Sequence, residues 1–260
     1  MTGSSAPLPL AGRVALVTGA SKGLGAAIAR QLHARGARLA LVGRDTEALS
    51  AVARDTHGLA LEADVTDPGA VLLALARVRA ELGPIAILVQ NAGVAASAPL
   101  ASTDDALWER TMAVNVTAPF RIARAVVPDM VSAGYGRVVH VASNAGLTGY
   151  AYTSAYCASK HALVGLTRAL AAEVAKSGVT VNAVCPGFLD TEMTDRTIET
   201  IVAKTGRSAA DARRTLEGLS PQRRLVDVKE VAHVVAMLCE DEARGVNGQS
   251  IAIDGGQVMQ

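Results

Sequence analysis

Short apolar runs alternate with amphipathic segments along almost the whole chain, and this alternation limits the folds open to it. Seven runs rich in β-branched residues have the length of strands: Arg13–Thr18, Arg38–Gly43, Leu59–Val65, Ile85–Gln90, Arg137–Ser143, Val179–Cys185 and Ser250–Asp254. Apolar residues spaced three to four apart mark the helices between them: Leu24–Ala34, Thr46–Arg54, Pro68–Leu82, Asp104–Ala133, Ser154–Lys176 and Val228–Cys239. The strands are too continuously apolar for a sheet with one wet face, so the pattern predicts a parallel sheet covered on both faces.

The expected fold class is therefore α/β: a Rossmann-type, doubly wound, parallel, seven-stranded sheet flanked by helices. The 260 residues would permit one domain or two by length alone. No linker rich in Pro, Gly or Ser interrupts the alternation, so one domain over residues 1–260 is expected. Residues 188–227 break the rhythm with two short helical patterns, and we expect a substrate loop or lid there; an ordinary surface excursion is the alternative.

Composition narrows the function. Lys and Arg number 25 against 24 Asp and Glu, which gives no electrostatic reason to expect a nucleic-acid partner and favours a small-molecule substrate. Three widely spaced cysteines form neither a disulfide framework nor a metal motif, and the five histidines are scattered, so no metal site is expected. With no signal-peptide pattern and no bilayer-length apolar stretch, we expect a cytoplasmic protein without a membrane partner.

A glycine-rich turn joins the first expected strand to the first helix. Residues 18–25 read TGASKGLG, and glycines let a backbone turn tightly and approach a pyrophosphate at a helix N-terminus. The spacing departs from G-x-G-x-x-G, and a purely structural tight turn is the alternative. The position between a strand and a helix favours a dinucleotide site, for which the turn offers these residues: Gly19, Ser21, Lys22, Gly23, Leu24 and Gly25.

The end of the second strand indicates which nicotinamide cofactor binds. An acid here would bind a ribose 2′-hydroxyl, whereas an arginine would accommodate a 2′-phosphate, and the sequence offers both Arg44 and Asp45. Asp45 precedes a helix and is needed as its N-cap, which leaves Arg44 for the phosphate. Lys22 adds a second cation nearby, so NADP(H) is favoured over NAD(H), although either cation could simply be solvated.

Ser143, Tyr156 and Lys160 form a candidate acid/base set. Tyr156 and Lys160 are four residues apart on an expected helix, so the ammonium can approach the phenol hydroxyl. A nearby fixed cation lowers the pKa of tyrosine from about 10 towards a useful value. Ser143, at the end of the fifth expected strand, could hydrogen-bond a substrate oxygen on which negative charge develops. An ordinary surface pair is the alternative for Tyr156 and Lys160.

These motifs together resemble the short-chain dehydrogenase/reductase family over residues 13–256. The residues that carry the resemblance are Thr18 to Gly25, Asp64, Val65, Asn91, Ala92, Gly93, Asn115, Ser143, Tyr156, Lys160, Pro186, Gly187 and Thr191. In that family, arginine directly after a second strand without a terminal acid is typical of NADP(H) enzymes, which agrees with the charge argument for Arg44. Gln90 stands where many members carry an asparagine, and we expect little consequence.

The resemblance implies a role for each matching residue. Tyr156 would be the proton donor, Ser143 the carbonyl orienter, Lys160 the ligand of the nicotinamide ribose and Asn115 the support of a water in a proton relay. The remaining cofactor contacts would come from Asp64 and Val65 at the adenine, from Asn91, Ala92 and Gly93 on the adenine side, and from Pro186, Gly187 and Thr191, the last at the nicotinamide amide. Taken singly, Asn115 could be an ordinary buried amide and Thr191 a helix N-cap.

Substrate and assembly follow less directly from the sequence. The chain is similar to reductases of 3-oxoacyl thioesters and polyketide-type ketones, and Tyr150, Tyr152, Phe188, Leu189 and Met193 could line the substrate pocket or simply pack in the core. Residues 131–136 carry no basic side chain, which favours coenzyme A thioesters or free ketones over carrier-protein thioesters. Family members are usually tetramers or dimers, so a homotetramer or homodimer is expected.

Two rival functions stay open from the sequence alone. The first is an NAD-linked secondary-alcohol dehydrogenase of the hydroxyacyl-coenzyme A type, which differs in cofactor and direction. The second, from another class, is a catalytically silent NADP-binding sensor or scaffold. Lys22 and Arg44 argue against the first, and a complete acid/base set argues against the second, because a protein that only binds has no chemical need for it.

Overall fold

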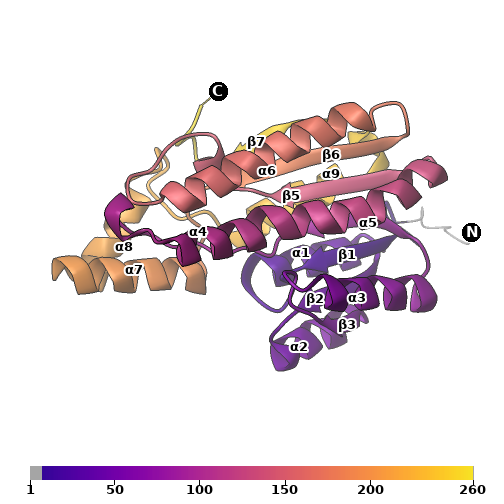
Figure 1. The fold of residues 1–260 in the computed structure, drawn as a ribbon, viewed down its shortest axis with the longest axis horizontal. Coiled ribbons are helices and arrows are strands. Elements are labelled where there is room, and N and C mark those ends of the chain that lie inside the picture. The colour runs from indigo at the N-terminus through magenta and orange to yellow at the C-terminus, as the bar shows by residue number, and fades with distance from the viewer. Residues whose placement is uncertain (1–7, 260) are drawn as a thin grey trace, which may run out of the picture.

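The computed structural model describes residues 8–259, and Figure 1 shows a central sheet between two layers of helices. Seven strands form one parallel sheet in the order β3-β2-β1-β4-β5-β6-β7, which confirms the expected fold class. Their bounds are β1 Val14–Thr18, β2 Arg38–Gly43, β3 Leu59–Glu62, β4 Ile85–Gln90, β5 Gly136–Val141, β6 Val179–Pro186 and β7 Ser250–Ile253. The strand order reverses between β1 and β4, and such a switch point opens a ligand crevice at the carboxyl ends of the strands.

Nine α-helices occur among residues 8–259. They are α1 Gly23–Ala34, α2 Thr46–Thr56, α3 Pro68–Glu81, α4 Asp105–Met112, α5 Ala118–Ala133, α6 Ser154–Glu173, α7 Glu192–Thr205, α8 Ala209–Glu217 and α9 Val228–Leu238. Short 3-10 turns lie at Leu100–Ser102, Asn144–Gly146 and Asp241–Ala243. No helix in the described part of the chain is long and apolar enough to cross a membrane.

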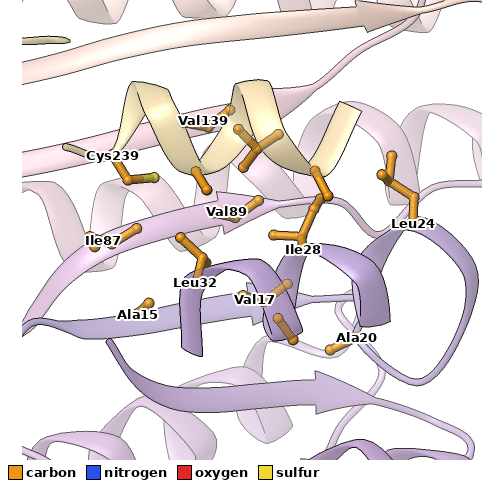
Figure 2. Packing of buried hydrophobic residues seen from close by; sticks show 14 of the residues in the cluster. Ala15, Val17, Ala20, Leu24, Ile28, Leu32, Ile87, Val89, Val139 and Cys239 are labelled. Carbon is orange, nitrogen blue, oxygen red and sulfur yellow. The ribbon is translucent and has the colours of Figure 1, made fainter. Parts of the chain in front are cut away.

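The core on one face of the sheet joins α1 to α9. Leu24, Ile28 and Leu32 repeat every four residues and form one buried stripe of α1. Figure 2 shows this stripe between the sheet residues Val17 and Val89 and helix α9. Burying each such aliphatic side chain stabilises the fold by roughly 1.5–3 kcal/mol, so the stripe fixes the glycine turn at the start of α1.

Helices α3, α5 and α6 cover the opposite face. Their buried residues pack against the alternate side chains of the strands, such as Leu16, Leu88 and Val138. Strand residues with an even number face these helices in β1 and β5 and, beyond an irregularity after Ile85, in β4. Gln90 and His140 follow the same alternation, which places two polar side chains on the face covered by α5 and α6.

The structure corrects several predicted boundaries. The third strand ends at Glu62 rather than Val65, because the Asp64 carboxylate accepts hydrogen bonds from the backbone N–H and hydroxyl of Thr66 in a turn. The expected helix over residues 104–133 is interrupted by a π-helical turn, Ala113–Thr117. The fifth strand ends at Val141, so Ser143 lies two residues beyond it and caps a 3-10 turn instead.

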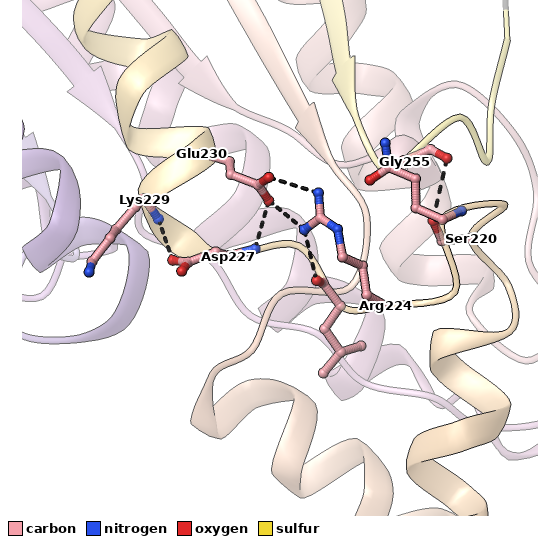
Figure 3. A network of polar contacts seen from close by, with 8 residues as sticks. Ser220, Arg224, Asp227, Lys229, Glu230 and Gly255 are labelled. Atoms are coloured by element: carbon pink, nitrogen blue, oxygen red, sulfur yellow. Dashed lines mark hydrogen bonds and ion pairs between the residues drawn. The ribbon is translucent and has the colours of Figure 1, made fainter.

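Residues 188–227 form an excursion from the sheet whose two ends lie next to each other. Leu189 pairs with Val226 in an isolated parallel bridge, and α7 and α8 between them pack around their own apolar cluster, which includes Ile198 and Leu216. In Figure 1 both helices project at one end of the molecule. Figure 3 shows the return: Arg224 forms a two-pronged ion pair with Glu230 at 2.8 Å for each prong, next to the N-cap of α9.

Candidate active site

The glycine turn between β1 and α1 has no room for side chains at two of its positions. A Cβ on Gly25 would lie 2.0 Å from the carbonyl oxygen of Gly19, and one on Gly19 would lie 2.9 Å from the Cα of Ala92. Gly19 and Gly23 also have positive φ angles of 65° and 55°. The turn therefore brings bare backbone to the N-terminus of α1, which is the cradle that a pyrophosphate requires. Leu24 lies in the core, so only its backbone is available to a cofactor.

Asn91 fastens this turn to the end of β4. Its side-chain amide donates to the carbonyl oxygens of Thr18 and Gly19 at 3.1 and 3.0 Å, and its backbone N–H donates to the Thr18 hydroxyl at 3.1 Å. Ala92 donates its backbone N–H to the same hydroxyl. These contacts bring the two sides of the switch point together, so Asn91 acts here through the backbone it supports.

The expected 2′-phosphate position lies at the end of β2. Asp45 accepts a hydrogen bond from the backbone N–H of Ala48 at 3.1 Å, so its expected role as the N-cap of α2 is confirmed. Arg44 is exposed, and its guanidinium lies 3.5 Å from a carboxylate oxygen of Asp64. Hydrogen bonds from Thr66 are the largest cause holding the pKa of Asp64 below its usual value, with Arg44 a smaller one. A Cβ at Gly43 would lie 2.3 Å from the Ser21 hydroxyl, so that hydroxyl would have to turn away to admit a side chain at this position.

Lys22 forms an ion pair that the sequence does not reveal. Its ammonium lies 2.8 Å from a carboxylate oxygen of Glu192, the first residue of α7, and both side chains are largely exposed. The same carboxylate lies 3.6 Å from Arg196. Thr191 occupies the N-cap position of α7 but its side chain makes no capping hydrogen bond; its methyl group faces Gly23 instead. The start of residues 188–227 therefore touches the glycine turn.

Ser143, Tyr156 and Lys160 come together at the carboxyl end of β5. Lys160 is buried and donates a hydrogen bond to the carbonyl oxygen of Val141 at 2.9 Å, with its ammonium 5.7 Å from the centre of the Tyr156 ring. Burial lowers the pKa of Lys160 to about 8. The one-turn spacing on α6 thus places the cation beside the phenol as expected.

The pKa of Tyr156 differs from the sequence-based expectation. Burial raises it, a hydrogen bond with the side chain of Ser143 lowers it in part, and the nearby Cys157 and Cys185 raise it further. The predicted net lowering by Lys160 is therefore wrong for the protein in this state, because burial of the phenol outweighs its favourable contacts. A raised pKa keeps Tyr156 protonated at neutral pH, which is the form that a proton donor needs.

Asn115 lies in the π-helical turn between α4 and α5. Its side-chain oxygen accepts from the backbone N–H of Val94 at 2.9 Å, and its amide donates to the Val94 carbonyl at 2.9 Å and the Ser159 hydroxyl at 3.0 Å. Ser159 in turn donates to the carbonyl oxygen of Tyr156 at 2.7 Å. Asn115 therefore joins the loop after β4 to the helix that carries the acid/base pair, a role that the sequence did not reveal.

The five residues expected to line a substrate pocket lie in different environments. Phe188 is partly buried against the cluster of α7 and α8, and Leu189 is partly buried against the main core. Tyr152 and Met193 are exposed. The Tyr150 hydroxyl is buried without a hydrogen-bond partner among residues 8–259, and burial raises its pKa to about 12. At the end of β6, a Cβ on Gly187 would lie 2.9 Å from the Asp254 Cβ, which explains the glycine after Pro186.

The parallel sheet agrees with comparisons against known proteins. The family model described as short chain dehydrogenase matches residues 13–201. The chain belongs to the short-chain dehydrogenase family of NAD(P)-dependent oxidoreductases that act on CH–OH groups. No group of three or more His, Cys, Asp and Glu side chains suited to a metal ion occurs among residues 8–259.

Individual relatives cover nearly the whole chain. The chain is 36% identical to the 3-oxoacyl-acyl-carrier-protein reductase FabG of Escherichia coli strain K12, over 95% of this chain and 98% of that one. It is also 36% identical to nodulation protein G of Rhizobium sp. strain N33, over 96% and 98% of the two chains. A crystal structure of an actinorhodin polyketide ketoreductase variant with NADPH has a TM-score of 0.91 and 34% identity, and covers 94% of this chain and 97% of its own.

Proposed function

We propose that this chain is an NADPH-dependent ketoreductase, which reduces a ketone to a secondary alcohol. The observation that carries the proposal is the buried Lys160–Tyr156 pair at the carboxyl end of β5, with the ammonium 5.7 Å from the centre of the phenol ring. A protein that only binds a dinucleotide could use Lys160 to hold the cofactor, but it has no chemical need for a complete acid/base set.

The chain offers a defined set of contacts to NADP(H). Backbone from Gly19 to Gly25 would hold the pyrophosphate, and Lys22 with Arg44 would bind the 2′-phosphate once their present carboxylate partners yield. The preference for NADP(H) is supported by the glycine at position 43 in place of an acid, by Arg44 directly after it, and by the NADPH of the similar ketoreductase. The remaining contacts proposed are Asp64, Val65, Asn91, Ala92, Gly93, Lys160, Pro186, Gly187 and Thr191.

The acid/base step uses three side chains. The bound nicotinamide supplies the hydride to the carbonyl carbon. Tyr156 gives its phenolic proton to the carbonyl oxygen, and Ser143 donates a hydrogen bond to that oxygen as negative charge develops. Lys160 stabilises the phenolate that Tyr156 becomes. Asn115 keeps the loop after β4 and helix α6 in place, so that these groups stay in register.

The proposed substrate class is a 3-oxoacyl thioester or a bulky free ketone. FabG and the actinorhodin enzyme act, by their names, on 3-oxoacyl groups and a polyketide ketone, which supports this class. Residues 188–227 would form a lid, because their two ends meet at Leu189 and Val226 while α7 and α8 carry their own core. We further propose a single cytoplasmic domain that assembles as a homotetramer or homodimer.

Initial rates of cofactor oxidation test the proposal. NADPH and NADH would be compared with acetoacetyl-coenzyme A, longer 3-oxoacyl thioesters and bulky ketones. The expected result is turnover with at least one substrate and a preference for NADPH that decreases in Arg44→Ala. Arg54→Ala, an exposed cation at the far end of α2, is the matched control. Faster rates with NADH would refute the cofactor preference, and tight NADPH binding without turnover would favour a silent binding module.

A further inference from the structure

The turn that carries Ser143 contacts two other parts of the chain. The Ser143 hydroxyl accepts a hydrogen bond from the backbone N–H of Ala145 at 3.1 Å, which ties it to the 3-10 turn. The turn lies directly against α6, since a Cβ on Gly146 would lie 2.8 Å from the carbonyl oxygen of Lys160. The other contact is made by the side chain of Asn144, which is 4% exposed and has no part in the proposed acid/base step.

Asn144 binds the segment that follows β7, residues 254–258, which we call the C-terminal segment. Its amide nitrogen donates to a carboxylate oxygen of Asp254 at 3.3 Å and to the side-chain oxygen of Gln257 at 3.1 Å. An ionised carboxylate only accepts hydrogen bonds, so the nitrogen of Asn144 must face Asp254. The side-chain oxygen of Asn144 is then left for the Ser143 hydroxyl, 3.5 Å away. A contact of this length is weak, so a substrate oxygen can replace it.

Asp254 is a buried charge that folds the C-terminal segment around itself. It is 3% exposed. One carboxylate oxygen accepts from the backbone N–H groups of Gly256 and Gln257 at 3.1 Å each, and the other accepts from Val258 at 2.9 Å and from Asn144. Burying a carboxylate is costly unless such hydrogen bonds compensate it. The carboxylate therefore holds the segment in one conformation and joins it to the 3-10 turn.

The C-terminal segment has supports of its own. Figure 3 shows the Ser220 hydroxyl, near the return of residues 188–227, donating to the carbonyl oxygen of Gly255 at 3.4 Å. Gly187 at the end of β6 leaves room for Asp254, because a Cβ on Gly187 would lie 2.9 Å from the Asp254 Cβ. The segment is thus fixed independently of Asn144 and can hold the turn in place.

We propose that Asn144 is a positioning residue, which holds the Ser143 hydroxyl in place by binding the C-terminal segment. The inference rests on the proposed function, in which Ser143 donates a hydrogen bond to the substrate oxygen. The bonds from Asn144 oppose a movement of the turn away from α6, the helix that carries Tyr156. Such a movement matters because a displacement of about 1 Å can lower the rate of an enzyme by about 10²-fold.

Two titratable side chains interact with the Asp254 carboxylate. Burial raises the pKa of Tyr150 to about 12, and Asp254 adds to the rise. Burial likewise raises the pKa of Cys185 to about 11. Both groups are therefore neutral around pH 7, so a pH dependence introduced by a second carboxylate can be read without a contribution from them.

The anchor is tested first by stability, without any turnover. Asn144→Ala, Gln257→Leu and the double variant would be compared by urea denaturation. Because the two substitutions remove the same hydrogen bond, the double variant should lose clearly less stability than the sum of the two single losses. Additive losses would overturn the anchor even if the enzyme is active.

The positioning role is tested by kinetics. Asn144→Ala should lower kcat for ketone reduction by about tenfold, with NADPH affinity unchanged in fluorescence titration. Asn144→Asp places a second carboxylate opposite Asp254, and two facing carboxylates favour a state that shares one proton. Its kcat should therefore be low at neutral pH and rise relative to wild type as the pH falls. The double variant Asn144→Asp/Asp254→Asn, with one carboxylate and one amide again, should recover part of kcat at neutral pH.

Asn182→Ala is the matched control. Asn182 is 1% exposed, and its side chain also makes two hydrogen bonds, to the carbonyl oxygen of Val246 and from the backbone N–H of Gln249, but these lie before β7. The substitution should lower stability without changing kcat.

The positioning role is refuted if Asn144→Ala lowers kcat no more than Asn182→Ala does, or if Asn144→Asp follows the pH profile of wild type. If wild type itself shows no turnover with any ketone, the proposed function and the positioning role both fail, while the urea data still decide the anchor.

Discussion

Replacing Asn115 by alanine tests how much its hydrogen bonds contribute to the stability of the fold. The substitution removes three hydrogen bonds, to the backbone N–H and carbonyl of Val94 and to the Ser159 hydroxyl. A typical intramolecular hydrogen bond contributes about 1 kcal/mol to stability, so the free energy of unfolding should fall by about 3 kcal/mol. Asn115 is 1% exposed, so water cannot readily replace the lost amide.

Urea denaturation followed by circular dichroism measures the change. Ser159→Ala is the matched comparison: it removes the bond from Asn115 and the one to the Tyr156 carbonyl but leaves the two bonds to Val94 in place, and it should cost about 2 kcal/mol. The reasoning is refuted if Asn115→Ala lowers the free energy of unfolding by no more than Ser159→Ala does.

Three further predictions follow from the same contacts. Tyr156→Phe should lower kcat, measured by initial rates, by about 10²–10⁴-fold. NADPH affinity, measured by fluorescence titration, should change little. An unchanged kcat would contradict the role of Tyr156 as proton donor. Glu192→Gln should remove the ion pair with Lys22 and tighten NADPH binding by about threefold, while the affinity for NADH stays unchanged. The effect is small because an exposed ion pair contributes at most about 1 kcal/mol. Equal effects on the two cofactors would contradict this. His140 has a pKa held below its unfolded value, so it contributes stability that is present above pH 6.5 and is lost as the pH falls towards about 4. Urea titrations should show wild type losing stability relative to His140→Val over that range, and parallel curves would refute it.

The fold was predictable because its signals are local. Each strand is a short apolar run, and Leu24, Ile28 and Leu32 mark the buried stripe of α1 in the sequence itself. The strand order needed only the alternation of strands and helices and the rules for parallel connections. The π-helical turn at Ala113–Thr117 was missed because its apolar spacing continues that of the flanking helices.

Candidate site residues could be proposed from the sequence, but their partners in the structure could not. The contacts of Lys22 with Glu192 and of Gln90 beside His140 join positions 170 and 50 residues apart, and no periodic pattern connects them. The pKa of Tyr156 was predicted in the wrong direction, because spacing reveals a neighbouring cation but not the burial that opposes it. A solitary buried histidine such as His140 gives no sequence signal of its contact with Thr167 on α6.

The central proposal is that the protein reduces a ketone with a hydride that NADPH would supply and a proton from Tyr156. The direct test incubates the protein with NADPH deuterated at the transferred position and a 3-oxoacyl thioester or bulky ketone, and analyses the product by mass spectrometry. The account predicts a secondary alcohol with one deuterium at the carbinol carbon for wild type, and almost none for Tyr156→Phe. Absence of deuterium transfer with every ketone offered, or equal transfer by Tyr156→Phe, would contradict it.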